Sequence, residues 1–305
     1  MASENFSYSR LETYENCHYK YHLRYDLKNY INGTNIATLF GTLVHKINEL
    51  QTNYIISGKK IDYDFLKEYF YKIGTDEMPT AEGRDAVYGV EVLKKNYPTE
   101  WTSVDKTGRT YAQKASDFIE TGMYRQEEYL KSSPYLYVYA AELPFEFHYD
   151  GYCFKGFIDR VLRYRNDEKH FVIHDIKTSA QAYDDKKCVT PLQMVIYCLA
   201  LKEMFGKDCV VDCFYEFPIA EELKAAGTPG FINRGLKKID SLISGIKSKD
   251  WKPTPSPLCY YCEYSNSNPN IADEGKNMCP YYSLWSPDNR KEFRTFLPWL
   301  GIECD

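Results

Sequence analysis

The chain has 305 residues, of which 44% are hydrophobic, so it can bury a sizeable core and is expected to be globular. Its formal net charge is -5, which excludes attraction of a polyanion by the field of the whole molecule and leaves only local basic patches. We see no secretory signal and no apolar run of about 20 residues, so we expect a cytoplasmic protein without a membrane span. The 10 cysteines favour thiols or metal ligands over a disulfide framework.

The first 50 residues predict two helices. Residues 7–30 predict a helix that begins after Ser7 or Ser9 and carries Cys17 on its inner side. Residues 36–50 predict a second helix, because their apolar positions recur at helical spacing. His45 lies at the flank of that apolar stripe, where a core or rim histidine with a satisfied hydrogen bond is the ordinary alternative to a metal ligand.

Residues 51–133 predict a helical insertion. Helical patterns over 63–73, 86–97 and 111–130 are separated by polar or Gly/Pro stretches, and none contains a catalytic pattern. We expect this insertion to lie within a single domain, residues 1–305, between His45 and a sheet. Its Lys and Arg residues suit either a substrate channel or solvated helix faces.

Two carboxylates belong to a predicted pair of strands. A strand over 135–150 ends at the turn Asp150-Gly151, and residues 152–179 then predict two adjacent strands joined by a polar turn at 166–168. Asp159 lies in the first of these strands, and Asp175 and Lys177 in the second. Together they can hold a divalent cation with a cationic group beside it. The alternative is an ion-paired hairpin in which Lys177 simply neutralises Asp175.

The last third of the chain adds a helix over 191–204, a strand over 209–217, a helix over 235–246 and a cysteine-rich segment, 253–305. Cys259 and Cys262 have a spacing at which two thiolates chelate one metal or cluster, and Cys279 follows. We favour Cys17 as the fourth ligand, since it would join this segment to the first helix. Free cysteines are one alternative, and zinc competes with an iron-sulfur cluster.

Five short motifs follow one another along the chain: SRLETYENCHYKY in the opening helix, GTLVH (41–45), GFIDR (156–160), DIKTS (175–179) and LQMVIY (192–197). In this order they resemble the RecB-like branch of the PD-(D/E)XK nuclease superfamily. The opening helix is similar to the branch's N-terminal helix, with His18 where a proline is common. The resemblance implies an α/β fold with a central mixed β-sheet flanked by helices. The helical insertion and a cysteine-rich segment packed on the N-terminal helix would complete this restriction-endonuclease-like core.

The resemblance also implies a set of site residues. His45, Asp159, Asp175 and the carbonyl of Ile176 would bind Mg²⁺ or Mn²⁺, and Lys177 would orient or activate the attacking water. Gln193 and Tyr197 would support the site, and Glu142 is a further acidic candidate. The cysteines Cys17, Cys259, Cys262 and Cys279 resemble the ligands of 4Fe-4S clusters in CRISPR-associated RecB-like exonucleases, although the gap before Cys279 is longer than in those families.

The implied function is that of a stand-alone, metal-dependent DNA nuclease. We expect an exonuclease acting on single-stranded DNA or DNA ends, with protein partners in recombination, repair or CRISPR adaptation. One rival is a non-catalytic DNA-binding or assembly subunit with a decayed site. Another is a zinc-stabilised enzyme acting on a different phosphate ester.

Overall fold

The computed structural model describes residues 5–31, 35–105, 107–268 and 271–279. The chain divides into two compact units. The first comprises Met1–Phe6 and Asn35–Leu236, and the second Ser7–Thr34 and Lys237–Asp305. Residues 280–305 of the predicted cysteine-rich segment lie outside the described residues.

The first unit is built on a six-stranded mixed sheet of order β1-β3-β4-β5-β6, in which β2 also pairs with β3. The strands are β1 (Asn5–Phe6), β2 (Leu136–Tyr149), β3 (Tyr152–Tyr164), β4 (His170–Ile176), β5 (Val210–Phe217) and β6 (Glu222–Ala225). β1 is parallel to β3 and β4 is parallel to β5, whereas the other pairs are antiparallel. The turn between β2 and β3 has positive φ at both Asp150 and Gly151, as the predicted hairpin requires.

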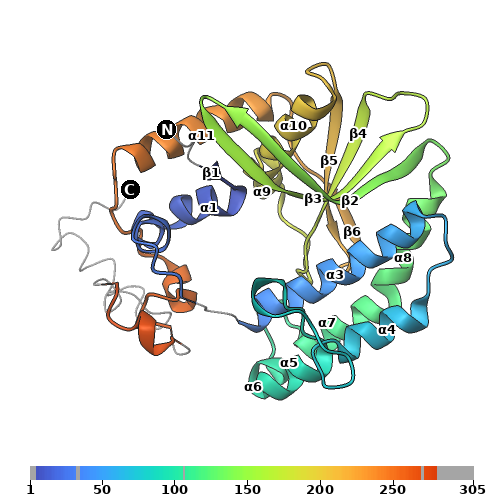
Figure 1. Ribbon diagram of the computed structural model, residues 1–305, viewed down its shortest axis with the longest axis horizontal. Coiled ribbons are helices and arrows are strands. Elements are labelled where there is room, and N and C mark those ends of the chain that lie inside the picture. The colour runs from blue at the N-terminus through green and yellow to red at the C-terminus, as the bar shows by residue number, and fades with distance from the viewer. Residues whose placement is uncertain (1–4, 32–34, 106, 269–270, 280–305) are drawn as a thin grey trace. The chain divides into compact units, whose positions relative to one another are not determined.

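Helices cover both faces of this sheet. The helical elements that begin in the first unit are α3 (Ile36–Ile56), α4 (Tyr63–Lys72), η2 (Gly83–Asp85), α5 (Val90–Asn96), α6 (Pro98–Thr102), α7 (Tyr111–Asp117), η3 (Phe118–Gly122), α8 (Met123–Ser132), α9 (Asp185–Val189), α10 (Leu192–Phe205) and α11 (Phe231–Lys247). Figure 1 shows α3 and α8 on one side of the sheet and α10 on the other. The mixed sheet flanked by helices confirms the predicted fold class.

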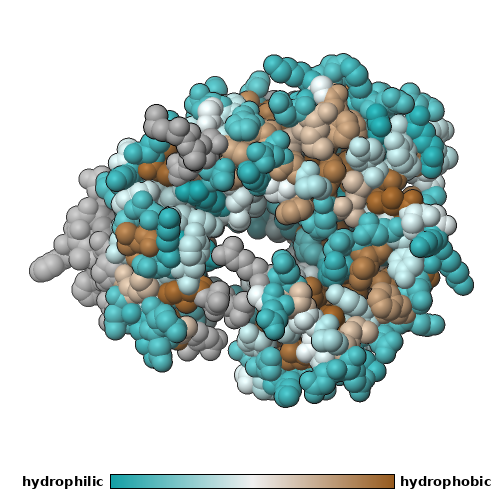
Figure 2. Space-filling model, viewed as in Figure 1, coloured by the Kyte–Doolittle hydropathy of each residue, from teal (hydrophilic) through white to brown (hydrophobic). Residues whose placement is uncertain are grey.

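The helix α3 packs one apolar face against the helices of the insertion. Phe40, Leu43, Val44 and Ile47 are at most 1% exposed and pack with apolar residues of α4 to α7. This packing explains why the insertion is helical, since each short helix contributes an apolar stripe to one shared core. The surface over these helices is largely hydrophilic, with apolar side chains in small patches (Figure 2).

The window Asp185–Phe205 is long and apolar enough to cross a membrane by length and composition alone. However, 56% of its most apolar 18-residue window is buried inside the structure. Its main part, α10, has fully buried side chains such as Met194, Val195 and Ile196. This burial is typical of a core helix.

The second unit joins the N-terminal helices to the end of α11 and the segment that follows. Its shorter elements are α1 (Tyr8–Asn16), α2 (His18–Tyr21), η1 (His22–Asp26), η4 (Pro257–Tyr261) and η5 (Asp273–Gly275). Glu263 pairs with Lys20 at 2.6 Å and with Arg24 at 2.7 Å. Tyr264 is 1% exposed and packs with Leu23 and Ile31. These contacts hold the segment around residue 264 against the N-terminal helices.

Some sequence predictions were wrong in detail. The single helix predicted over 7–30 is three pieces, because Cys17 has extended backbone angles and its sulfur caps α2 by accepting a hydrogen bond from the Lys20 N–H. Ser7 is the N-cap, as predicted. The connection predicted after 217 contains β6, which was missed because it is short and mostly exposed. β1 and α9 were also missed, and both are shorter than a pattern can reveal.

A buried polar network lies within the first unit, on β3, β4 and β5. Arg160 is 0% exposed, and its Nη1 lies 2.6 Å from Glu216 Oε2. His174 Nδ1 lies 2.8 Å from the same oxygen, and Thr52 and Asn48 of α3 accept hydrogen bonds from Arg160. Burial alone would raise the pKa of Glu216, but the charge of Arg160 and the contact with His174 outweigh it and lower the pKa to about 2.

We expect Glu216→Gln to lower the free energy of unfolding by roughly 3–5 kcal/mol, because it leaves the buried Arg160 without its counter-ion. Urea unfolding at pH 7 measures the loss. Glu222→Gln is the control, because Glu222 is exposed on β6 opposite Phe217, and we expect it to change stability by less than about 0.5 kcal/mol. Equal stability of the two variants would show that the network contributes nothing.

Candidate active site

The site lies in the first unit, where β3 changes its hydrogen-bonding partner. One edge of β3 pairs with β1 through Cys153 and Phe154, and with β4 from Arg160 to Arg163. Between these two segments, at Asp159, the side chain of β3 and not its backbone bonds to β4. Asp159 Oδ2 accepts a 2.7 Å hydrogen bond from the N–H of Ile176. The carboxylate of Asp159 is thereby fixed at the carboxyl end of β4.

Three potential metal ligands meet at this point. Ligand atoms of His45, Glu142 and Asp159 all lie within 4.8 Å of one another. His45 comes from α3, and its Nδ1 lies 3.6 Å from Asp159 Oδ2. Glu142 comes from β2, just beyond a register shift between Val138 and Ala140, and has a φ of 44°. This left-handed conformation is strained for glutamate, and such strain is found at functional sites.

Asp175 and Lys177 complete the acidic centre. Asp175 is the next-to-last residue of β4, whose Phe171 and Ile173 are fully buried, and the carboxylate itself is 1% exposed. Lys177 Nζ lies 2.5 Å from Asp175 Oδ2. Asp175 Oδ1 is buried and has no hydrogen-bond partner among the residues that the structure describes. A buried, unpartnered carboxylate oxygen is costly, and a cation would remove that cost.

A short hydrogen-bond chain positions the lysine. Lys177 Nζ donates to Gln193 Oε1 at 2.9 Å, and Gln193 Nε2 donates to Tyr197 Oη at 2.8 Å. Gln193 and Tyr197 are one turn apart on α10, which packs against the sheet. The ammonium group of Lys177 is therefore held between Asp175 and α10.

The electrostatics show an excess of negative charge. Burial raises the pKa of Asp159 to about 6, although Lys177 opposes the shift. Burial likewise raises the pKa of Asp175 to about 6, with Lys177 opposing and Asp159 adding to the shift. Burial, followed by the charges of Asp159 and Glu49, raises the pKa of Glu142 to about 7. The positive charge of Lys177 does not neutralise the three carboxylates of Asp159, Asp175 and Glu142.

The imidazole of His45 suits the same role. Burial lowers the pKa of His45, so the ring favours its neutral form, which is the form that binds metals. The backbone of Ile176, whose carbonyl is one of the predicted ligands, opposes this lowering of the His45 pKa. Carboxylate oxygens with one imidazole fit Mg²⁺ or Mn²⁺, so the residues present suit the divalent ion that the sequence implies.

The predicted cysteine ligands lie in the second unit. Cys17, Cys259, Cys262 and Cys279 all line one cavity of about 260 Å³. Backbone N–H groups point at two of the sulfurs: the Lys20 N–H donates to Cys17 at 3.5 Å, and the Ser256 N–H donates to Cys259 at 3.4 Å. Burial raises the pKa of the Cys262 thiol to about 12. Within the described ranges, the groups of three ligand atoms that lie close together do not include these thiols.

The structure thus brings His45, Glu142, Asp159, Asp175, Lys177, Gln193 and Tyr197 into one centre, and the four cysteines around one cavity. Sequence reasoning missed Arg160, His174 and Glu216, which support the strands beside Asp159 and Asp175. Arg160 and His174 are each adjacent to a predicted site carboxylate. Their position next to Asp159 and Asp175 was the one feature of the sequence that could have indicated a role for them. The alternation of residues in a strand does not reveal that both contact Glu216.

The chain matches one protein family and is similar to solved structures. A family model described as the PD-(D/E)XK nuclease superfamily matches residues 5–267. A solved structure described as a "Putative exonuclease" from Eubacterium rectale is similar at 12% identity, with a TM-score of 0.43. That similarity covers 85% of this chain and 87% of the other. No curated protein matches the chain.

We expect Glu142→Gln to raise the melting temperature of the metal-free protein by a few degrees at pH 8 and not at pH 4.5. The pKa of Glu142 rises on folding from 4.5 to about 7, so the folded state binds more protons between these values and loses stability as pH increases through them. Glutamine removes that loss. The same change should weaken Mn²⁺ binding, measured by calorimetry.

Glu203→Gln, at an exposed position on α10, is the matched control and should change neither quantity. A Glu142→Gln protein with parental stability at pH 8 would contradict the electrostatic account of this site.

Proposed function

The chain belongs to the PD-(D/E)XK nuclease superfamily, and from this membership we propose that it is a metal-dependent DNA nuclease. Its reaction is hydrolysis of phosphodiester bonds, carried out as an exonuclease on single-stranded DNA or DNA ends. The observation that carries the proposal is the buried oxygen of Asp175, which has no hydrogen-bond partner in the described part of the chain, beside the group formed by His45, Glu142 and Asp159.

The residues of the centre have distinct roles in this proposal. His45, Glu142, Asp159, Asp175 and the carbonyl of Ile176 would hold Mg²⁺ or Mn²⁺. When bound, such an ion polarises a phosphate oxygen and makes a coordinated water more acidic. The carboxylates also exclude a second anion, so DNA phosphate can approach only when their charge is neutralised.

Lys177 is the proposed positioning and charge-stabilising group. Burial disfavours its charged form, but Asp175 outweighs this effect and raises the pKa of Lys177, so it stays protonated. A protonated lysine cannot accept the proton of the attacking water. It can orient that water by donating a hydrogen bond and can stabilise negative charge that develops on the phosphate. Gln193 and Tyr197 keep the ammonium group in place.

The rival functions are less well supported. A non-catalytic DNA-binding or assembly subunit has no need for strained Glu142 or for paired carboxylates with raised pKa values. A zinc-stabilised enzyme for another phosphate ester could use the same centre, and only substrate tests separate it. We further propose a cytoplasmic role with protein partners in recombination, repair or CRISPR adaptation.

We expect Asp159→Asn and Lys177→Met each to lower the rate of DNA cleavage by roughly 10²–10³-fold, because each removes a group aimed at transition-state charge. The assay follows end-labelled linear single- and double-stranded DNA with Mn²⁺, and circular single-stranded DNA. Circular DNA should resist an exonuclease.

Lys207→Met, at an exposed position before β5, is the control and should cut at the parental rate. If Lys177→Met still binds linear DNA, its slower cleavage reflects loss of the chemical step and not loss of DNA binding. Cleavage by Asp159→Asn at the parental rate would remove Asp159 from the proposed metal site. DNA binding without cleavage by the parental protein would leave the rival DNA-binding function, and cleavage of circular DNA would make the enzyme an endonuclease.

We also propose that Cys17, Cys259, Cys262 and Cys279 ligate a 4Fe-4S cluster in the second unit. Their common cavity and the N–H groups directed at Cys17 and Cys259 support this, since such hydrogen bonds accompany cluster thiolates. The thiols do not form the close group that one tetrahedral zinc needs, in which sulfurs would be about 3.8 Å apart for Zn–S bonds near 2.3 Å.

We expect protein purified without oxygen to be brown and to contain four irons per chain, as the proposed cluster requires. Cys17→Ser and Cys279→Ser should lose the colour and lower the melting temperature, whereas Cys188→Ser, at a buried thiol on α9, should keep both. Colourless protein with one zinc would replace the cluster by a zinc site. Absence of both metals would remove the proposal.

A further inference from the structure

A second group of metal-ligand atoms lies near the turn of the hairpin formed by β2 and β3. A carboxylate oxygen of Glu146, a ring nitrogen of His148 and the sulfur of Cys153 all lie within 4.8 Å of one another. We propose that these three side chains bind a transition-metal cation, Zn²⁺ in particular. The inference does not depend on the proposed nuclease activity.

The strand register explains why the three side chains converge. Glu146 and His148 are two residues apart on β2 and so share a face of the sheet. His148 is directly opposite Cys153 on β3, and Glu146 is opposite Lys155. Glu146 and Cys153 are therefore diagonal neighbours, within reach of each other.

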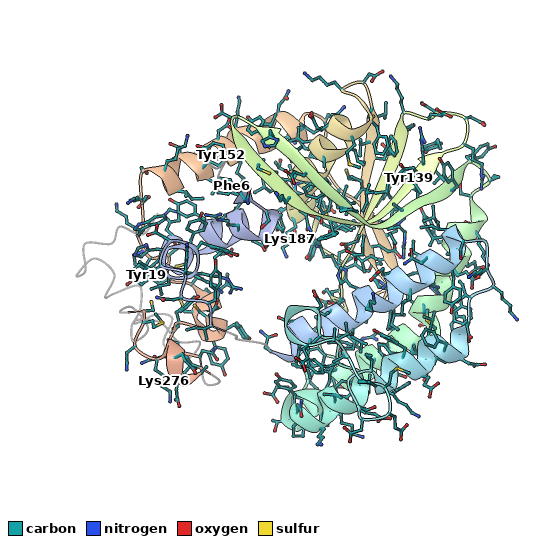
Figure 3. All side chains as sticks on the ribbon, viewed as in Figure 1. Phe6, Tyr19, Tyr139, Tyr152, Lys187 and Lys276 are labelled. Carbon is teal, nitrogen blue, oxygen red and sulfur yellow. The ribbon has the colours of Figure 1, made fainter. Side chains whose placement is uncertain are left out.

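The backbone of this region is held in place before any metal binds. The tight turn at Asp150 and Gly151 closes the hairpin through the pair Tyr149 and Tyr152. On the edge of β3 that does not pair with β2, β1 pairs with it at Cys153. Phe6 of β1 packs edge-to-face on Tyr152 at 5.4 Å, and Figure 3 shows these two labelled rings together. A metal would thus bind to strands that are already fixed in register.

The donor set selects the kind of metal. One thiol, one imidazole and one carboxylate are the ligand types of zinc, whereas Mg²⁺ requires oxygen ligands. Cys153 Sγ now lies 3.4 Å from Glu146 Oε1, and Lys155 holds the other oxygen of Glu146 at 2.9 Å. The thiol proton leaves to solvent when the sulfur–metal bond forms, so binding releases one proton. Three protein ligands leave the fourth position for water, since Glu146 and His148 are exposed.

This group is separate from the acidic centre. Cys153 and Asp159 are six residues apart on β3, which corresponds to about 20 Å along the strand. The two sites also differ in chemistry, because His45, Glu142 and Asp159 offer no sulfur. A sulfur-specific signal that depends on Cys153 therefore reports the hairpin site, once Cys259 and Cys262, the closely spaced cysteine pair of the second unit, are removed.

The test uses the full chain with Cys259→Ser and Cys262→Ser, titrated with Co²⁺ as a spectroscopic substitute for Zn²⁺. We expect a thiolate-to-cobalt charge-transfer band that saturates at one equivalent and disappears on addition of Zn²⁺. Adding Cys153→Ser should abolish the band, and adding His148→Gln should weaken Co²⁺ binding at least tenfold. Adding Cys209→Ser or His170→Gln should change nothing. Cys209 is another buried thiol, and His170 is another histidine beside a carboxylate, Asp212.

Absence of the band, or a band that survives Cys153→Ser, would overturn the proposal. If the double-serine background does not fold, the otherwise unaltered chain provides a second measurement. Its zinc content, determined in excess Mg²⁺, should then fall by one equivalent with Cys153→Ser and remain unchanged with Cys209→Ser. Equal zinc content in these two variants would also overturn it.

Discussion

The burial of Asp159 and Asp175 at the point where β3 and β4 separate is the constraint on which the first unit depends. Burial raises the pKa of both carboxylates to about 6, so the folded chain bears a cost for keeping them ionised at neutral pH. Lys177 offsets only part of that cost, since Asp175 Oδ1 has no partner among the described residues. The site is an incomplete charge arrangement, and a divalent cation is the group that would complete it.

The neighbouring positions show that the fold can stabilise a buried carboxylate fully. Glu216 is 7% exposed, yet Arg160 and His174 hold its pKa at about 2. Each partner directly follows or precedes a site aspartate in the sequence. Burial is similar at Glu216 and at the two site aspartates. Their pKa values shift in opposite directions because Arg160 neutralises Glu216, whereas Lys177 offsets only part of the effect of burial on Asp159 and Asp175. Arg160 fixes the strands, and the adjacent aspartates are left with unsatisfied charge.

The sequence predicted much of this arrangement, because strong local patterns place the residues. Helical spacing of apolar residues located α3 and with it His45, and the end of a buried strand located Asp175 and Lys177. Other features depend on long-range contacts. Glu142 reaches the site through a register shift and a positive φ, which no pattern reveals. The partnership of Arg160 with Glu216 joins residues 56 apart, and Cys17 interrupts a helix that periodicity alone continues.

The hairpin of β2 and β3 links the two proposed metal sites. Glu142 and Asp159 lie near its middle, and Glu146, His148 and Cys153 lie toward its turn. Pairing along the hairpin fixes the register of both strands, and a slip of one strand by one residue would turn the ligands on that strand to the opposite face. The register that positions the acidic centre therefore also brings the thiol, imidazole and carboxylate together. A metal bound near the turn would in return oppose fraying of the strands that carry Glu142 and Asp159.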